Sequence, residues 1–171
     1  SPTSPKICAF SAQAMTVRGL ITVEMSPLMK PLRVMSATRT IAMIVRRPAS
    51  QTDFNGTVLV EWQNVTAGYD LDALWNRRHV REGYVWVGVS AQRVGVDQLR
   101  GWSPTRYGSL DVTGGGAFVG DELSYDIFAQ AAQALKSPGA VDPLQGLNVE
   151  RILAIGASQS AGRMTVYYNV V

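Results

Sequence analysis

The sequence predicts an α/β fold in which a mostly parallel sheet lies between layers of helices. From residue 57 onward, short β-branched runs alternate with segments of helical spacing, the pattern of parallel strands joined by helices. Residues 84–90 are almost wholly apolar, as in a strand buried on both faces. Residues 152–163 pass from an apolar run through small residues into a helical pattern. Since such sheets bind ligands beyond the carboxyl ends of their strands, that last junction is the first place to look for a site.

Each element follows from its local pattern. We expect strands at residues 41–45, 57–62, 84–90 and 152–155, where β-branched and aromatic residues cluster. We expect helices at 71–82, 121–135 and from 160 onward. Asp70 or Asp72 is suited to cap the first helix, and Gly83 is suited to end it. These elements divide the chain into a poorly readable segment, 1–38, with a possible first strand at 19–25, and a domain at 39–171.

A long connection without strand character follows the strand at 84–90. Residues 92–120 are rich in glycine, arginine and aromatic residues, and we expect them to form an irregular loop. Loops of this length in compact domains are usually functional, so this one is predicted to cover the site as a lid or pocket wall. Trp102 lies within it and is a candidate for contact with substrate.

Composition excludes several classes of function. The net charge of +3 comes from scattered arginines rather than a basic patch, so no nucleic-acid partner is expected. One cysteine rules out an internal disulfide and a cysteine-rich metal site, and no metal or other cofactor is expected. No stretch has the length of a membrane span and no signal-peptide pattern is visible. A soluble protein is expected, and the sequence does not decide between export and the cytoplasm.

The segment Gly156-Ala157-Ser158-Gln159-Ser160 has two chemical interpretations. A nucleotide-binding turn would belong to the first strand of its fold, with an acidic residue about 20 positions later, whereas this turn follows the third strand of the alternation. A nucleophile elbow needs small residues around a serine, because only they permit the tight turn that exposes its hydroxyl. Gln159 N–H, at the start of the helix, would then face the developing oxyanion. From these five residues alone, an ordinary turn with a capping serine remains an equal alternative.

Several blocks of the sequence, in order, resemble the α/β-hydrolase domain family of bacterial serine esterases. The resemblance covers about residues 39–168 and rests on five blocks: Phe54–Gly68, Gly83–Gln92, Arg106–Leu110, Ser124–Phe128 and Gly156–Ala161. It implies a three-layer hydrolase sheet that stops after the helix following the elbow. It implies that Ser158 is the nucleophile of an acyl-enzyme mechanism on carboxylic esters. It further implies a second oxyanion donor after the strand at 57–62, from the backbone of Val65 or, second, Asn64.

The resemblance also implies a catalytic acid and a catalytic histidine that this sequence does not supply. His79 is the single histidine, and it falls in the predicted helix 71–82, away from the strand ends. The expected partners are therefore a small-molecule ester and the missing C-terminal half of the same fold. Two alternatives stay open: a non-catalytic α/β module or hydrolase remnant that binds a partner, and a nucleotide-binding domain.

Overall fold

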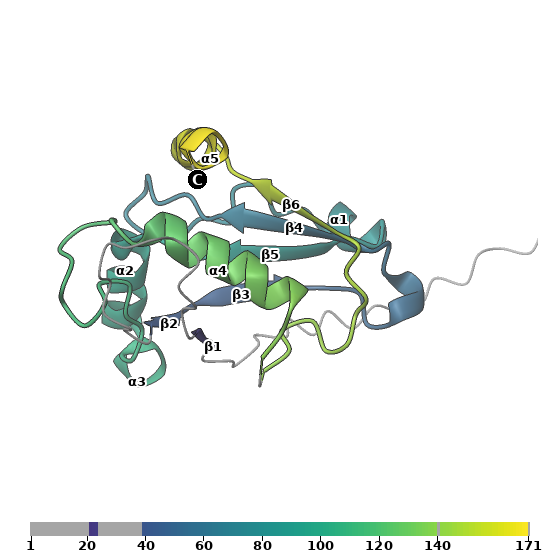
Figure 1. Ribbon diagram of the computed structural model, residues 1–171, viewed down its shortest axis with the longest axis horizontal. Coiled ribbons are helices and arrows are strands. Elements are labelled where there is room, and N and C mark those ends of the chain that lie inside the picture. The colour runs from purple at the N-terminus through teal and green to yellow at the C-terminus, as the bar shows by residue number, and fades with distance from the viewer. Residues whose placement is uncertain (1–20, 24–38, 140, 171) are drawn as a thin grey trace, which may run out of the picture.

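The computed structural model describes residues 21–23, 39–139 and 141–170, and Figure 1 shows how their elements are arranged. The strands are β1 (Ile21–Val23), β2 (Arg39–Ile41), β3 (Met43–Arg46), β4 (Thr57–Trp62), β5 (Val85–Val89) and β6 (Arg151–Ile155). The helices are η1 (Gln51–Asp53), α1 (Arg77–Arg81), α2 (Arg93–Trp102), α3 (Pro104–Tyr107), α4 (Ser124–Lys136) and α5 (Gln159–Val170). Of the possible strand at 19–25, residues 21–23 are a strand and the rest lies outside the described residues.

The main sheet has the strand order β3-β5-β4-β6. Strand β4 pairs in parallel with both β5 and β6, while β3 pairs with β5 antiparallel. Strands β1 and β2 form a separate antiparallel pair. The prediction of an α/β fold with a mostly parallel sheet is confirmed. The chain passes from β4 to β5 on one side and later returns to β6 on the other, so the carboxyl ends of β4 and β6 flank a switch point where ligands typically bind.

One face of the sheet packs against α4, which crosses the front of the sheet in Figure 1. Trp62 is fully buried on this face and stacks on Phe128 of α4, with ring centroids 5.1 Å apart. Tyr125 of the same helix meets Trp62 edge-on at 5.2 Å. Burial of each large aromatic side chain stabilises the fold by about 1.5–3 kcal/mol, so this contact is a major part of the core.

The other face holds a buried carboxylate instead of a purely apolar layer. Glu61 is fully buried and accepts hydrogen bonds from Leu74 N–H at 3.0 Å and from the Trp86 indole at 2.8 Å. Burial raises the pKa of Glu61, and these two donors oppose that rise. The Arg46 guanidinium lies over the rings of Trp75 and Trp86, at 4.5 and 4.6 Å. This polar layer ties the segment after β4 to the sheet.

The predicted helix at 71–82 is only partly correct. The helix α1 spans Arg77–Arg81, and Asn76 caps it by accepting a hydrogen bond from Arg78 N–H, so the predicted caps Asp70 and Asp72 are wrong. The first half of the segment is not helical because Leu74 N–H is taken by Glu61. Gly83 ends the helix as expected, with a φ of 85° that favours glycine.

The prediction of an irregular loop at 92–120 is only partly correct, because Arg93–Trp102 and Pro104–Tyr107 form α2 and α3, while residues 108–120 are irregular. In α2, Val96 is buried while Arg93 and Asp97 form an ion pair on the outer side, at 3.1 Å. The (i, i+4) spacing of that charged pair was a helical signal that the glycines obscured. The predicted lid is therefore largely a pair of short helices.

Two glycines of α2 give a matched test of this packing. An added methyl group at Gly95 would lie 2.5 Å from Cγ of Asp70, whereas at Gly101 it would meet nothing within 4 Å. We expect Gly95→Ala to lower the free energy of unfolding by about 2 kcal/mol or more through overpacking. Gly101→Ala should raise it by about 0.5–1 kcal/mol, because alanine favours the helix. Urea unfolding of both variants measures the difference, and equal stabilities would contradict the packing of Asp70 on α2.

Candidate active site

The elbow lies between β6 and α5 and has the backbone that an exposed nucleophile needs. Ser158 has a φ of 53°, in the left-handed region that a non-glycine residue rarely adopts, and its side chain is exposed. Gln159 follows as the first residue of α5. Because the first N–H groups of a helix have no partner within it, Gln159 N–H is directed outward at the elbow. The strained turn and the exposed serine occur at the same position.

The residues two positions before and after the serine, Gly156 and Ser160, hold the turn tight. Ser160 is fully buried, and its hydroxyl lies 2.9 Å from both the nitrogen and the carbonyl oxygen of Ala157. Any side chain at Gly156 would come within 2.7 Å of the Ser160 carbonyl oxygen, so glycine is required there. Gly162 has no such role, because an added methyl group would meet nothing within 4 Å.

The segment after β4 reaches the elbow through Asn64. Its side-chain amide donates to the carbonyl oxygen of Ala157 at 2.8 Å, which joins the ends of β4 and β6. The backbone N–H of Asn64 is already bonded to Leu71 O at 3.3 Å. Asn64 is buried, and so is Val65 beside it. The Asn64 N–H, one of the two predicted oxyanion donors, therefore already has an acceptor within the loop.

The backbone N–H of Val65 faces the side chain of Gln159. The distance from Val65 N to Gln159 Oε1 is 3.5 Å, longer than a typical N–H···O hydrogen bond. A weakly bound N–H is one that a stronger acceptor can take. The structure thus brings Ser158, Gln159, Asn64 and Val65 together at the switch point of the sheet.

The strain at Ser158 makes a prediction about stability. At most positions glycine is less stable than alanine, but at a left-handed residue the order reverses because glycine has no Cβ to clash. We expect Ser158→Gly to be more stable than Ser158→Ala by about 1 kcal/mol in thermal unfolding. The control is Ala157, which is not among the positive-φ residues. Ala157→Gly should destabilise by about 0.5–1 kcal/mol. A lower stability for glycine at both positions would argue against the strained turn.

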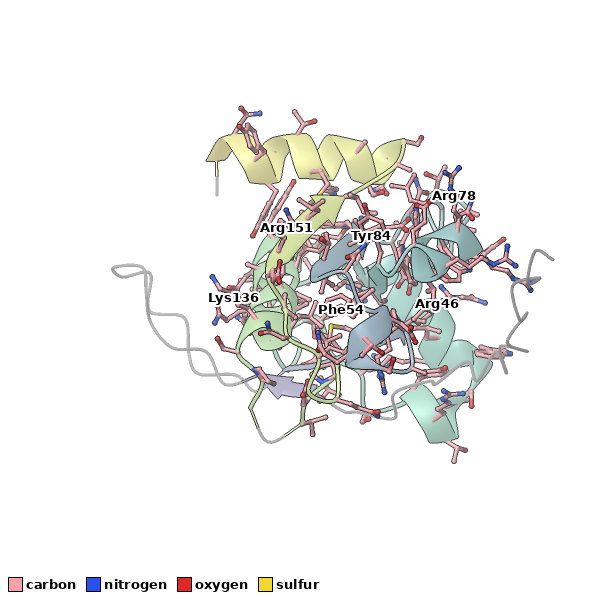
Figure 2. All side chains as sticks on the ribbon, turned by 90° about the vertical axis from the view of Figure 1, so that its right-hand side faces the viewer. Arg46, Phe54, Arg78, Tyr84, Lys136 and Arg151 are labelled. Carbon is pink, nitrogen blue, oxygen red and sulfur yellow. The ribbon has the colours of Figure 1, made fainter. Side chains whose placement is uncertain are left out.

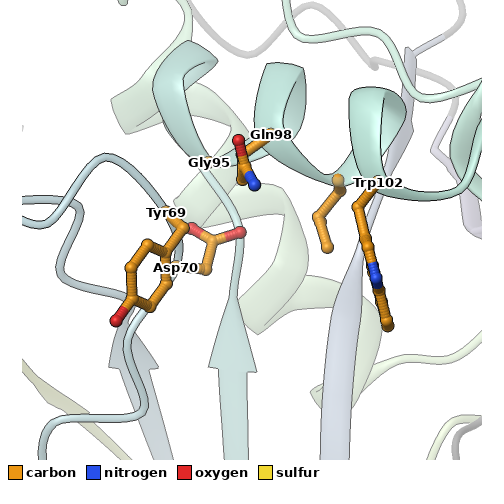
Figure 3. Close-up of a pocket in the computed structure, with 6 residues that line it drawn as sticks. Tyr69, Asp70, Gly95, Gln98 and Trp102 are labelled. Carbon is orange, nitrogen blue, oxygen red and sulfur yellow. The ribbon is translucent and has the colours of Figure 1, made fainter.

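Trp102 lies at a different part of the carboxyl edge, in a cavity of about 280 Å³. Figure 3 shows Tyr69 and Trp102 on either side of Asp70, below α2. The Trp102 side chain is 70% exposed and stacks on Tyr107, with centroids 5.9 Å apart. A hydrogen bond from Gly68 N–H to Val65 O closes a turn after β4, and Tyr69 follows that turn directly. The loop after β4 therefore borders both the elbow and this cavity.

Asp70, which lines the cavity, was missed as a functional candidate. Its Oδ2 accepts a hydrogen bond from the Ser90 hydroxyl at 2.5 Å, and its Oδ1 is buried without a hydrogen-bond partner in the described part of the chain. Burial raises the pKa of Asp70 from 3.8 to about 6, with the Ser90 hydrogen bond opposing and nearby Asp72 adding to the rise. No sequence signal marked this residue, since its burial depends on α2.

This raised pKa predicts a pH-dependent stability. The folded state binds the Asp70 proton more tightly, so its contribution is full below the unfolded pKa of 3.8 and is lost as pH rises through about 6. The loss amounts to up to about 3 kcal/mol. We expect Asp70→Asn to remove this dependence and to be more stable than the wild type near pH 7. Urea unfolding from pH 4 to 7.5 measures it; parallel curves for the two proteins would show that Asp70 titrates normally.

His79 does not join this site. It lies in α1, half-buried and edge-on to Tyr84, with ring centroids 6.4 Å apart. Tyr84 immediately precedes β5, and Figure 2 views the molecule from this amino end of the parallel strands, where Arg78 and Tyr84 are labelled. Ser158 follows the carboxyl end of β6, at the other end of the sheet. The expectation that His79 is remote from the carboxyl ends of the strands, where the site lies, is confirmed.

The part of the chain that the structure describes has no group of three or more metal-ligating side chains that could hold a metal ion. In the same residues, no helix is both long and apolar enough to cross a membrane.

In comparisons with known proteins, the family model described as alpha/beta hydrolase domain matches residues 11–171. No curated protein and no solved structure matches the chain.

Proposed function

Because the chain belongs to the alpha/beta hydrolase domain family, we propose that it carries the nucleophile and oxyanion site of a serine hydrolase acting on carboxylic esters. The observation that carries this proposal is the exposed Ser158 at a φ of 53°, between a strand and a helix. A strained turn persists where the surrounding fold holds it, and such turns concentrate at functional sites.

In the proposed reaction the Ser158 hydroxyl attacks the ester carbonyl carbon. Its proton passes to a general base, the alcohol leaves with a proton, and water then hydrolyses the acyl-enzyme. The negative charge that forms on the carbonyl oxygen is stabilised by the N–H groups of Gln159 and Val65. Each such donor contributes about 100- to 1,000-fold to the rate. We assign Val65 ahead of Asn64 because the Asn64 N–H is bonded to Leu71.

Residues 1–171 contain one histidine, His79, which lies in α1 beside Tyr84 at the amino end of β5. It is therefore not a suitable general base for Ser158. We propose that the base and its acid partner are supplied by a polypeptide that docks at β6, which has one sheet neighbour among the described strands and exposes Leu153 by 49%. The helix α5 lies along this side (Figure 2). Its Tyr168 is 90% exposed. The partner that we propose for this surface is the C-terminal half of the same fold.

A chemical rescue tests the proposal on the chain itself. Free imidazole serves as the missing base, so we expect it to accelerate p-nitrophenyl acetate hydrolysis by the wild-type chain above the rate with Ser158→Ala, which corrects for imidazole's own reaction. Acetylation mapped to Ser158 by mass spectrometry would support the assignment. Equal rates for the two proteins at all imidazole concentrations would contradict it.

The open side of β6 and α5 favours one second candidate, a non-catalytic module that binds a partner. Exposed apolar side chains at these two elements are a common feature of interaction surfaces: Leu153, Val166, Tyr168 and Val170. The two candidates differ in the reactivity of Ser158. A chain that binds a partner through β6 but never acylates, even with imidazole, would be the module and not the enzyme.

A further inference from the structure

The side chain of Gln159 is held by a hydrogen-bond relay that starts far from the elbow. Its Nε2 donates to Gln92 Oε1 at 2.9 Å, and Gln92 is buried at the start of α2. The same Gln92 oxygen accepts the Trp62 indole N–H at 3.0 Å. Gln92 Nε2 in turn donates to Asp121 Oδ2 at 2.9 Å. The relay therefore connects the segments that follow β4, β5 and β6.

The two ends of the relay fix the direction of every amide in it. The Trp62 indole can only donate, so it requires the oxygen of Gln92. The Asp121 carboxylate, which also accepts from Arg93 N–H and Arg163, requires the nitrogen. The Gln92 oxygen must therefore face Gln159 as well, and Gln159 must donate to it through its own side-chain nitrogen. This leaves Gln159 Oε1 facing the Val65 N–H, at 3.5 Å.

Asp121 is itself anchored independently of the amides. Its Oδ1 accepts the Arg93 backbone N–H at 2.8 Å, and its Oδ2 also accepts Arg163 at 2.9 Å. The carboxylate is thus fixed by the first turn of α2 and by α5. Because two charged or backbone partners hold it, loss of one leaves its acceptor toward Gln92 in place.

We propose that Gln92 and Gln159 are positioning residues whose relay keeps the Val65 peptide turned with its N–H toward the elbow. This rests on the proposed function, in which Val65 is an oxyanion donor. The contact at 3.5 Å is long enough for a substrate oxygen to displace, yet it orients the N–H before substrate arrives. The same peptide is also held on its carbonyl side, where Asn64 O accepts a hydrogen bond from Leu71 N–H at 2.8 Å. Without the Gln159 contact the peptide is held from that side alone, and its N–H is less firmly directed at the elbow. The side chain of Gln159 would then act in addition to its backbone N–H.

The orientation of Val65 can be read on this chain without any catalysis. In ¹⁵N spectra, we expect Gln159→Met and Gln92→Met to shift the Val65 amide resonance and to speed its hydrogen exchange by about 10-fold or more. Gln92→Met should also move the Trp62 indole resonance. Arg163→Met is the matched control, since it removes a partner of Asp121 but leaves the amide order intact, and it should leave Val65 unchanged. Wild-type behaviour of Val65 in both methionine variants, or an equal disturbance in Arg163→Met, would overturn the relay.

Gln159→Glu separates hydrogen-bond direction from mere packing. As a carboxylate it cannot donate to Gln92 Oε1, but its protonated form can donate there and accept from Val65 at once. Lowering the pH should therefore return the Val65 resonance of this variant toward that of the wild type. Gln159→Met and the wild type, followed over the same pH range, account for effects of pH that do not come from residue 159. A Val65 resonance that stays displaced at every pH would contradict the relay, and this test stands even where Gln92→Met fails to fold.

The catalytic consequence is measured by labelling with a fluorophosphonate, whose phosphoryl oxygen occupies the oxyanion site. We expect the slow labelling of Ser158 to fall by about 10-fold in Gln159→Met and Gln92→Met, and to be unchanged in Arg163→Met. Unchanged labelling in both methionine variants, with a displaced Val65, would overturn the positioning role. Failure of the wild-type chain to label at Ser158 under any condition would overturn the proposed function instead, and the Val65 response identifies which of the two has failed.

Discussion

Replacing Ser158 by alanine should abolish both fluorophosphonate labelling and ester turnover. In an enzyme assembled with its base, we expect a loss of several orders of magnitude, because a nucleophile and base that act as a unit are lost together. The structure supports this expectation through the exposure of Ser158 at the strained turn. The measurement is the rate of p-nitrophenyl ester hydrolysis, with the labelled residue identified by peptide mapping.

Ser160 is the matched control for that substitution. It is two positions away, fully buried, and bonded to the backbone of Ala157. Ser160→Ala should cost about 1–2 kcal/mol of stability, because the Ala157 N–H loses its acceptor, and should leave most of the labelling. Turnover that survives Ser158→Ala but not Ser160→Ala would place the chemistry elsewhere and remove the basis of the proposed mechanism.

Replacing Glu61 by alanine should cause the largest loss of stability at a single charged residue. The substitution leaves the Leu74 N–H and the Trp86 indole without their acceptor and opens a cavity at a fully buried position. Two orphaned donors and the cavity together amount to about 3–5 kcal/mol, a large part of the stability of a typical domain. Urea unfolding measures it, and the loop after β4 should lose hydrogen-exchange protection first.

Two comparisons define the cause of that loss. Glu61→Gln keeps the volume and one acceptor, so we expect a smaller loss of about 1–2 kcal/mol. Glu150→Ala removes a carboxylate that is 62% exposed and lies 4.0 Å from Arg151, so the effect should be within about 0.5 kcal/mol. A Glu61→Ala protein as stable as Glu150→Ala would show that the buried carboxylate contributes nothing.

The strands and the elbow could be predicted because their causes are local. β-Branched runs specify β4 and β5 directly, and the small residues around Ser158 are the ones that a tight turn requires. The helix at 71–76 could not be excluded from sequence, because the acceptor that disrupts it is Glu61, 13 positions from Leu74. In this error a tertiary contact overrode a local preference, whereas in α2 a local helical signal, the Arg93–Asp97 spacing, was obscured by the glycines.

The oxyanion site shows the same limit. The two segments that form this site could be predicted. The choice of Val65 over Asn64 as the backbone donor depends on the hydrogen bond from Asn64 N–H to Leu71 O, which no spacing rule gives. The relay partner of Gln159 lies 67 positions away, at Gln92. Buried amides carry no periodicity, so their pairing follows only from the fold.

The open side of β6 has a consequence for regulation by mass action. Ser158 sits three residues beyond a strand that has one neighbour, β4, in the described sheet. A polypeptide that binds this edge stabilises the ordered elbow by RT ln(1 + [L]/Kd), or about 2.7 kcal/mol at one hundred times its Kd. The fraction of chains with a competent serine then follows the concentration of that partner. Under the proposed function, a base that arrives with a separate partner at this edge would make the reactivity of Ser158 half-maximal where the partner reaches its dissociation constant, and dilution would lower it.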